Sequence, residues 1–271
     1  MFRLMKFLPV LFALLPAVPA YAQVTERQVV VRDDLENAFR EIGTEGTFVM
    51  LELSKNRMTV VNAARHMRGY LPASTFKIPN ALIALETGVI RDASHPVFKW
   101  DGTKRTFDAW NKDHTPESAF RASAVWVFQE IAREITSTRM RVYVSQFGYG
   151  NRDIGGNEAS FWLDGKLRIS ALQQVEFLER LYIGKLPVNP KNVQIVKNMM
   201  FLEKIGDATL RGKTGWIPSG DNKIGWFAGW VERGGETYIF ALNLDPNEEK
   251  HVAARISIAK ALLAQLGALP K

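Results

Sequence analysis

The sequence has 271 residues, 46% of them hydrophobic and 11% aromatic, which is enough to build the buried core of one large domain or two small ones and argues against a disordered chain. Its formal net charge is +7 without any run of five like charges, so scattered surface lysines and arginines are a better interpretation than a patch for nucleic acid. It contains no cysteine, which excludes disulfides, thiolate nucleophiles and cysteine-based zinc sites.

Residues 1–22 have the pattern of a secretory signal peptide. Arg3 and Lys6 form a basic start, residues 7–15 form a short apolar core, and small residues precede an expected cleavage site before Gln23. Cleavage would remove those two cations and leave a net charge of about +5 on the mature chain. The apolar core is shorter than the roughly 20 residues of a bilayer-spanning helix, which disfavours the alternative of an uncleaved anchor. We therefore expect a periplasmic protein with no membrane contact after cleavage.

The first part of the mature chain predicts a helix, a β-hairpin and a second helix. Residues 33–43 place acidic residues before apolar residues at helical spacing and end in glycine. Residues 47–53 and 58–61 are rich in strand-forming residues on either side of a polar turn, which predicts a hairpin. A further helix is expected to open at Ser74 and to end at Gly88.

From about residue 89 to residue 205 helical periodicity dominates, and strand patterns return only afterwards. Helices are predicted at 123–135, 137–147, 170–183 and 192–202, strands at 208–213, 224–232 and 237–244, and a last helix at 251–266. This order predicts an α/β protein of the α+β type: a mostly antiparallel sheet flanked by the N- and C-terminal helices, with an all-helical lobe at 89–205 inserted between its strands. Residues 23–271 would form a single domain, with a small-molecule cleft between its two lobes.

A hydroxyl and an amine lie three residues apart in residues 74–77, Ser-Thr-Phe-Lys. Positions i and i+3 share one face of a helix, so an unprotonated Lys77 nitrogen beside the Ser74 hydroxyl could take its proton and activate it as a nucleophile. The alternative is an N-cap serine followed by a solvated lysine. The same spacing in Ser257 and Lys260, inside the last amphipathic helix and without companion motifs, indicates ordinary surface residues.

Lys213-Thr214-Gly215 supplies a second set of polar groups, at the end of the strand predicted at 208–213. A cation and a hydroxyl on a strand edge bind an anionic carboxylate, and the glycine lets a ligand approach the backbone closely. Alone, the triplet is equally compatible with a polar strand end. A Ser-x-x-Lys that opens a helix, followed by a Lys-Thr-Gly that ends a strand, is the combination found in active-site serine β-lactamases and penicillin-binding proteins.

The remaining motifs narrow this group. The Ser-Asp-Asn of class A enzymes is absent, and the chain resembles a class D β-lactamase, or oxacillinase, over nearly the whole of residues 23–271. The matching segments are Ser74-Thr75-Phe76-Lys77, Ser123-Ala124-Val125, Tyr149-Gly150-Asn151, Trp162-Leu163-Asp164-Gly165, Lys213-Thr214-Gly215, Gly225-Trp226-Phe227-Ala228-Gly229-Trp230, and Arg255. The resemblance implies a serine β-lactamase/transpeptidase-like fold and a β-lactamase catalytic domain.

The resemblance also implies a role for each matching residue. Ser74 would be the nucleophile that opens the β-lactam ring, and Lys77 would carry a carbamate made from CO₂ that serves as general base in acylation and deacylation. Trp162 would hydrogen-bond that carbamate, and Ser123 would relay a proton to the β-lactam nitrogen. Substrate contacts and pocket lining would come from Lys213, Thr214, Gly215, Trp216, Arg255, Val125 and Leu163, with the backbone amides of Ser74 and Trp216 forming the oxyanion hole.

Physical chemistry is compatible with a carbamate at this position. A lysine attacks CO₂ only as a neutral amine, and an ordinary pKa of about 10.4 leaves almost none neutral at neutral pH. Burial of Lys77 among apolar neighbours would lower that pKa. The expected neighbours are Phe76, Val125, Trp162 and Leu163. An indole N–H can only donate, which suits an anionic partner.

The histidines and the loop motif are assigned no chemistry. The four histidines are His66, His95, His114 and His251. They show no metal-ligand spacing and no Gly-x-Ser-x-Gly motif accompanies them, so neither a metal site nor a Ser-His-Asp hydrolase is expected. Tyr149 and Asn151 would mainly shape their glycine-rich loop. No cofactor is expected apart from the CO₂-derived carbamate on Lys77.

The expected function is hydrolysis of β-lactam antibiotics, in particular penicillins and oxacillin-type compounds. This activity would confer antibiotic resistance. Two alternatives stay open. The first is a β-lactam sensor domain that stays acylated; such domains are attached to membrane-spanning helices. The second is a penicillin-binding transpeptidase or carboxypeptidase, which would lack a carbamate pocket. Segments flanking residues 216–223 resemble carbapenem-hydrolysing oxacillinases, although the loop itself decides substrate preference. The expected partners are β-lactam small molecules, without nucleic acid, and the chain is expected to be a monomer or a homodimer.

Overall fold

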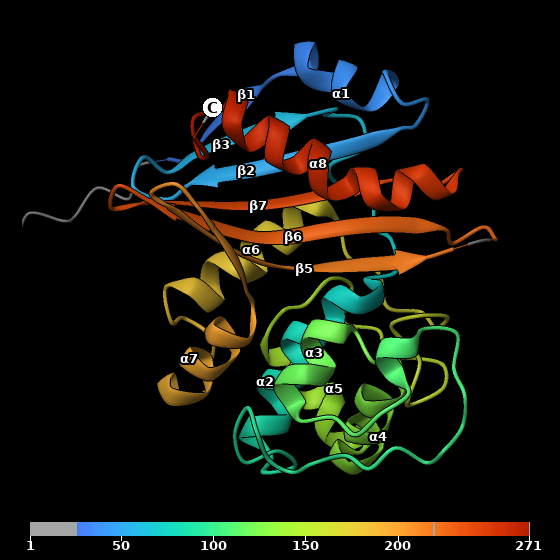
Figure 1. The fold of residues 1–271 in the computed structure, drawn as a ribbon. Coiled ribbons are helices and arrows are strands. Elements are labelled where there is room, and N and C mark those ends of the chain that lie inside the picture. Colours follow the sequence, from blue (N-terminus) through green and yellow to red (C-terminus); the bar gives the residue numbers. More distant parts are fainter. Residues whose placement is uncertain (1–25, 219, 271) are drawn as a thin grey trace, which may run out of the picture.

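A seven-stranded sheet organises the part of the chain that the computed structural model describes, residues 26–218 and 220–270 (Figure 1). Its strands are β1 (Gln28–Val31), β2 (Gly46–Glu52), β3 (Arg57–Val61), β4 (Phe201–Ile205), β5 (Ala208–Ile217), β6 (Ile224–Arg233) and β7 (Glu236–Leu244). They lie in the order β1-β3-β2-β7-β6-β5-β4, with β1 parallel to β3 and every other neighbouring pair antiparallel. The prediction of a mostly antiparallel sheet is confirmed.

The helices fall into a group that flanks the sheet and a group that forms a separate lobe (Figure 1). They are η1 (Asp33–Glu36), α1 (Asn37–Arg40), η2 (Ala73–Phe76), α2 (Lys77–Glu86), η3 (Asp108–Trp110), α3 (Pro116–Ala122), α4 (Val125–Ile135), α5 (Ser137–Gln146), α6 (Ala171–Tyr182), α7 (Pro190–Met199) and α8 (Glu249–Gln265), where η marks a 3₁₀ helix. None of the helices in the described residues is long and apolar enough to cross a bilayer. The expected signal peptide and its cleavage site before Gln23 lie outside the described residues.

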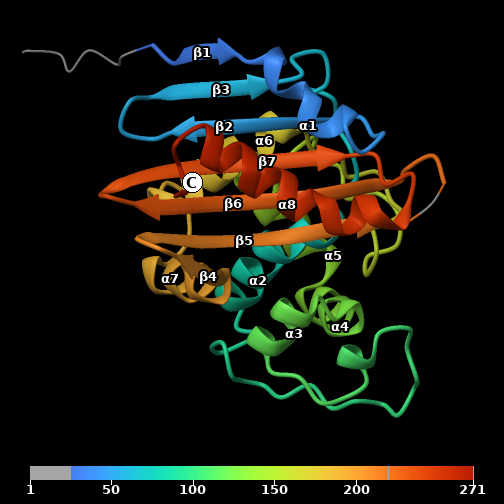
Figure 2. The ribbon, with the colours of Figure 1, turned by 45° about the horizontal axis from the view of Figure 1, so that its top comes forward.

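The two faces of the sheet carry separate apolar cores. Alternate residues of a strand point to opposite faces, so β6 places Phe227 in one core and Trp226 in the other. On the Phe227 face, α1 and α8 cover an aromatic cluster in which the Phe240 ring lies 5.1 Å from that of Phe227 and 6.2 Å from that of Phe48, between centroids. Figure 2 shows α8 running across the strands on this face, whereas α6 lies on the opposite one. The expected covering of the sheet by the N- and C-terminal helices is confirmed.

Local capping explains where the helices of the lobe begin and end. α3 starts at Pro116, after a capping box in which the Thr115 side chain accepts a hydrogen bond from the Ser118 backbone N–H at 3.1 Å. It ends at Ser123, whose left-handed φ of 55° reverses the chain before α4 begins at Val125. The prediction that a helix opens at Ser123 is therefore wrong by two residues, because Ser123 terminates α3. This turn presents the Ser123 side chain towards β5.

Three strands differ from the sequence prediction, the first being β1, which was not predicted. β4 lies inside the region expected to be helical: α7 ends at Met199, and the side chains of β4 then alternate between half-buried and exposed, as an edge strand requires. β5 continues to Ile217 instead of ending at Lys213, because its last four residues pair with the start of β6. The helical part of the lobe consequently ends before residue 201. Whether 23–271 is one domain stays a prediction.

Candidate active site

Ser74 and Lys77 lie together where η2 passes into α2. The Ser74 Oγ and the Lys77 Nζ are 2.9 Å apart, one helical turn along the chain. Ala73 just before them has a left-handed φ of 50°, and its N–H donates to the Trp162 carbonyl at 3.0 Å. Ser74 is only 9% exposed and Lys77 only 1%. The hydroxyl and the amine of the Ser-x-x-Lys motif are thus in direct contact in a nearly dry environment.

The surroundings of Lys77 favour its neutral form. Burial lowers the pKa of Lys77 well below that of an ordinary lysine, and the neighbouring Lys213 cation lowers it further. The Nζ lies 5.2 Å from the centroid of the Phe128 ring, an aromatic neighbour that the sequence did not indicate. A neutral amine has a free lone pair, so at this distance it can accept the proton of the Ser74 hydroxyl.

Of the four apolar residues expected around Lys77, two are fully buried, and one of these two carries a buried polar atom without a partner in the described residues. Phe76 and Trp162 are fully buried and stack at 5.4 Å between ring centroids, whereas Val125 and Leu163 are half-buried. The Trp162 Nε1 is buried and has no hydrogen-bond partner among the described residues. A buried donor left without an acceptor costs about 1–3 kcal/mol, so this N–H suits a ligand or modification that brings an acceptor.

Lys213 approaches the same space from β5. Its Nζ donates to the Ser123 Oγ and, at 3.0 Å, to the Thr214 carbonyl oxygen. Burial lowers the pKa of Lys213 to about 7, and the nearby Arg255 cation contributes to this shift. The structure therefore brings together the serine of the Ser-Ala-Val motif and the lysine of the Lys-Thr-Gly motif, 90 residues apart in the chain.

Gly215 lets β5 run directly against the serine. A Cβ atom at this position would lie 3.0 Å from the Pro72 carbonyl oxygen and 3.2 Å from the Ser74 nitrogen, a distance that side chains rarely tolerate. β4 pairs with β5 only as far as Arg211, so the edge of β5 that continues to Trp216 is not covered by a strand. The close packing places the Ser74 amide beside the backbone that leads to Trp216.

A cavity of about 440 Å³ opens between these elements. The residues predicted from the sequence that line it are Ser74, Ser123, Val125, Leu163, Thr214, Gly215, Trp216 and Arg255. Arg255 enters from α8; burial lowers its pKa to about 10, and its Nε has no partner in the described part of the chain. Lys213 lines an adjoining cavity of about 370 Å³, and Lys77 and Trp162 are fully buried and line neither.

Known proteins share this sequence and this fold. Residues 46–265 match the family described as the penicillin binding protein transpeptidase domain. The chain is 46% identical to Beta-lactamase OXA-5 of Pseudomonas aeruginosa, over 84% of this chain and 86% of that one, and 42% identical to Beta-lactamase OXA-48 of Klebsiella pneumoniae, over 94% and 98%. It resembles the crystal structure of the class D β-lactamase YbXI from Nostoc with a TM-score of 0.84 at 40% identity, over 88% of this chain and 100% of that one. The chain belongs to the class D β-lactamases.

The resemblance to oxacillinases, the fold and the enzyme class expected from the sequence are thereby confirmed. As a class D β-lactamase, this chain is a serine hydrolase that acts on β-lactams. Such chemistry needs a nucleophile, a base beside it and hydrogen-bond donors around the reacting carbonyl. The contact between Ser74 and Lys77 supplies the first two, although the roles of the individual residues stay predictions.

Several residues that line the cavity of this β-lactamase were missed in the sequence. They are Phe107, Ala109, Trp110, Ala122 and Val252. The first three come from the irregular segment 99–113, where no periodicity marks a buried face. The sequence offered one signal for them: two aromatic residues, Phe107 and Trp110, lie three positions apart in an otherwise polar stretch. An aromatic side chain in such a stretch can be exposed and available to a ligand, and Phe107 is 45% exposed.

A buried polar cluster below the nucleophile was also missed. The Gln174 Nε2 on α6 donates to the Thr75 Oγ1 at 2.8 Å, and the Thr75 hydroxyl donates to the Pro72 carbonyl at 2.6 Å. Gln174 and Thr75 are fully buried. Together these bonds hold the turn on either side of Ser74.

Tyr149 and Asn151 lie in the loop that they were expected to shape. The Tyr149 ring is fully buried and meets Phe76 edge to face at 5.6 Å between centroids. The Asn151 side chain joins its loop to the segment before α6, accepting from the Arg168 N–H at 3.0 Å and donating to the Lys166 carbonyl at 2.9 Å. Neither side chain lines the catalytic cavity.

Other candidate sites carry no matching chemistry. In the described residues, no group of three or more histidine, aspartate or glutamate side chains is placed to hold a metal ion. His66 and His251 make contacts with backbone carbonyls instead. A larger cavity of about 500 Å³, lined in part by Arg40, Arg65 and Arg68, contains none of the predicted site residues.

Proposed function

We propose that this class D β-lactamase hydrolyses penicillins and oxacillin-type compounds through an ester intermediate on Ser74. The observation that carries the proposal is the 2.9 Å contact between the Ser74 Oγ and the buried Lys77 Nζ. Because burial and the Lys213 cation hold the pKa of Lys77 well below its usual range, the nitrogen beside the hydroxyl is a more available base than that of an ordinary lysine. A positioned general base typically contributes about 10²–10⁴-fold to the rate.

In the proposed acylation, the Ser74 Oγ forms a bond to the lactam carbonyl carbon while its proton moves to the base at the Lys77 position. The ring C–N bond breaks, and the leaving nitrogen takes a proton through the Ser123 hydroxyl, which Lys213 contacts. Backbone amides of Ser74 and Trp216 would stabilise the negative charge on the carbonyl oxygen. In deacylation, the same base takes a proton from water, the resulting nucleophile attacks the ester, and the Ser74 oxygen regains its proton.

We further propose that the base is a reversible carbamate formed by CO₂ on the Lys77 Nζ. Two observations support it: burial shifts the Lys77 amine towards the neutral form that reacts with CO₂, and the Trp162 Nε1 is a buried donor without a partner in the described residues. When formed, the carbamate supplies an anionic oxygen base in the pocket. Half-buried Val125 and Leu163 would restrict water around it.

Substrate binding would depend on the cationic side of the cavity. Lys213, Thr214 and Arg255 come together at its edge, and we propose that they hold the carboxylate of the β-lactam. A cavity of about 440 Å³ lies in the size range of sites for one small organic molecule. No organic cofactor or metal is required by this scheme.

Substrate range and location belong to the same proposal. Trp216 and Pro218 place the start of the 216–223 loop in the wall of the cavity. We propose carbapenems as a further substrate class, on the resemblance of the segments flanking this loop to carbapenem-hydrolysing oxacillinases. Cleavage of a signal peptide would deliver the enzyme to the periplasm, where it would confer resistance to β-lactams, as a monomer or a homodimer.

Hydrolysis is tested by incubating the purified protein with a penicillin while intact mass and absorbance are followed together. We expect steady turnover, with an adduct on Ser74 that is transient, and neither signal in Ser74→Ala. A stable adduct with negligible turnover would contradict the proposal and indicate a sensor or a transpeptidase.

The carbamate is tested separately by NMR with ¹³C-labelled bicarbonate. We expect a carbamate resonance in the wild-type enzyme that is absent from Lys77→Ala. A resonance that persists in this variant would show that the carbamate is formed elsewhere.

A further inference from the structure

The irregular segment 99–113 brings aromatic side chains into the catalytic cavity. Phe107 and Trp110 line the cavity on either side of Ala109, and their rings lie 4.9 Å apart between centroids. We call this pair the aromatic wall. Apart from the three-residue turn η3, the segment has no regular helix or strand, and an isolated bridge joins the residues that flank it, Phe98 and His114. Irregular surface segments are ordinarily mobile, so a fixed wall needs specific contacts.

Arg105 and Asn111 close the segment around the wall. The Arg105 backbone N–H donates to the Asn111 Oδ1 at 2.8 Å, and the Asn111 Nδ2 donates back to the Arg105 carbonyl at 3.1 Å. Within the span that these two bonds close, the Trp110 backbone N–H donates to the Phe107 carbonyl at 2.9 Å. The seven-residue span 105–111, which carries both aromatic rings, is therefore held at its two ends by one asparagine side chain.

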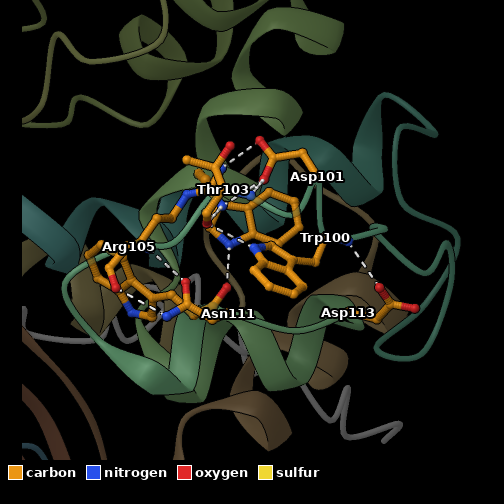
Figure 3. A network of polar contacts seen from close by, with 8 residues as sticks. Trp100, Asp101, Thr103, Arg105, Asn111 and Asp113 are labelled. Carbon is orange, nitrogen blue, oxygen red and sulfur yellow. Dashed lines mark hydrogen bonds and ion pairs between the residues drawn. The ribbon is translucent and has the colours of Figure 1, made fainter.

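The Arg105 side chain joins the hydrogen-bonded span 105–111 to the rest of the segment (Figure 3). Its guanidinium forms two bonds of 2.9 Å to the two oxygens of Asp101 and a third of 3.1 Å to the Thr103 carbonyl. It also lies 5.0 Å above the ring centroid of Trp126, and only 20% of the side chain is exposed. Such a forked, stacked geometry uses features of arginine that lysine lacks.

Trp126 and Trp110 connect the wall to the catalytic residues. The Trp126 Nε1 donates to the Trp110 carbonyl at 3.0 Å, and the Trp110 Nε1 donates to the Ala122 carbonyl at 2.9 Å. Ala122 precedes Ser123, whose hydroxyl is bonded by Lys213. An unbroken series of contacts thus runs from the Arg105 guanidinium to the edge of the reacting centre.

We propose that Arg105 and Asn111 are positioning residues: they fix the aromatic wall before a substrate binds, and so determine how tightly the cavity holds a β-lactam with a bulky apolar acyl side chain. A preformed apolar surface binds more tightly than one that must be ordered by the ligand, because the cost of ordering is removed. The inference rests on the proposed hydrolysis and adds to it the two residues that position the wall.

A neighbouring ion pair provides a matched control. Lys99 and Asp113 form a 2.7 Å pair on the same segment, with side chains 78% and 46% exposed. In the described residues, no hydrogen bond or ion pair joins the Lys99 side chain to the aromatic wall. Exposed pairs of this kind contribute little to stability. Lys99→Ala therefore removes a charge from the segment without breaking the hydrogen bonds that close the span 105–111.

The test compares two substrates, a penicillin with a large aromatic acyl side chain and the penicillin nucleus without one. For Arg105→Ala we expect KM for the bulky substrate to rise about tenfold with kcat within about twofold, and both constants for the nucleus to stay near wild type. Arg105→Lys, which keeps the cation but not the fork, should recover only part of the loss. Lys99→Ala should leave both substrates unchanged.

A second variant and a second readout keep the inference independent of folding and of turnover. Asn111→Asp retains the acceptor for the Arg105 N–H and loses the donor, so it should shift the same KM by a smaller factor. Equal losses for both substrates, no change for either, or the same shift in Lys99→Ala would overturn the inference. The preference is also read from the rate of adduct formation by mass. Absence of turnover in the wild-type enzyme would thus contradict the proposed hydrolysis and still leave the role of the wall measurable.

Discussion

At the scale of single residues, a substitution at Trp162 tests whether the pocket around Lys77 holds a carbamate or is an ordinary apolar core. Trp162→Phe keeps a ring stacked on Phe76 and removes only the buried N–H donor. We expect kcat to fall about 10- to 100-fold, because a hydrogen bond to a charged group contributes about 1.5–3 kcal/mol. Added bicarbonate should restore part of the activity. The measurement is steady-state hydrolysis of a penicillin at several bicarbonate concentrations.

Trp230 offers the matching control for this substitution. It is also fully buried, and its Nε1 also has no partner in the described residues, yet its ring packs against Tyr182, whereas that of Trp162 stacks on Phe76. Trp230→Phe should leave both kcat and the bicarbonate response unchanged. Equal effects in the two variants would mean that Trp162 acts only through packing.

The lowered pKa of Lys213 predicts that activity falls as the pH rises above neutrality. Burial and Arg255 lower its pKa to about 7, so the free enzyme loses this cation as the pH rises through that value. An anionic substrate prefers the protonated form, and kcat/KM reports the free enzyme. We expect kcat/KM for a penicillin to decrease above about pH 7. In Lys213→Arg, which stays charged, the alkaline decrease should disappear, whereas an unchanged profile would assign it to another group.

At the scale of elements, Gln174 ties α6 to the turn that carries the nucleophile. Gln174→Leu keeps a similar volume and leaves the Thr75 hydroxyl without its 2.8 Å donor in a fully buried place. We expect the free energy of unfolding to fall by about 1–3 kcal/mol, measured by urea denaturation. Activity should fall in the folded protein as well, because the backbone on either side of Ser74 loses a hydrogen bond that helps to hold it in place.

Gln194 serves as the control for this substitution. It lies on the exposed side of α7, where its Nε2 donates to the Asn198 Oδ1 at 2.9 Å. Gln194→Leu should change stability by no more than about 0.5 kcal/mol, as surface substitutions usually do. A Gln174→Leu variant as stable as this control would show that the buried bond contributes nothing net.

Elements with a strong local signal were predicted within a few residues, and those that depend on distant partners were not. The β2–β3 hairpin, β6, β7 and α8 each carry their own periodicity and turn residues. β1 and β4 are edge strands of four and five residues, and β1 owes its conformation to a parallel pairing with β3. Sequence patterns over so few residues cannot identify such a partner.

The candidate site divides in the same way. Ser74 and Lys77 were found because their chemistry requires a fixed spacing within one helical turn. Gln174 was missed because it meets Thr75 across 99 residues and looks like any other helical glutamine. Phe107 lines the cavity only through the three-dimensional path of an irregular segment, which no periodicity in the sequence records.

At the scale of the whole molecule, the catalytic cavity depends on how the helical lobe sits against the sheet. Ser123 comes from the lobe, Thr214 from β5 and Arg255 from α8, so no single element contains the site. The buried indole of Trp226 on β6 donates to the Leu71 carbonyl at 2.9 Å, which joins the sheet to the segment that leads into η2. Contacts that hold the sheet in shape therefore affect the site at a distance.

A partly buried ion pair joins segments that follow β3 and β7, 180 residues apart in the chain, and leads to the last prediction. Arg65, 6% exposed, donates to the two oxygens of Asp245 at 2.6 and 2.9 Å and to the Asn243 Oδ1 at 2.8 Å. Asp245→Asn should lower the free energy of unfolding by about 3 kcal/mol, because it leaves a buried guanidinium without its counter-charge. The exposed pair of Arg233 and Asp207 is the control, and Asp207→Asn should cost less than about 1 kcal/mol in the same urea titration. Equal effects of the two substitutions would show that burial does not amplify the Arg65 pair.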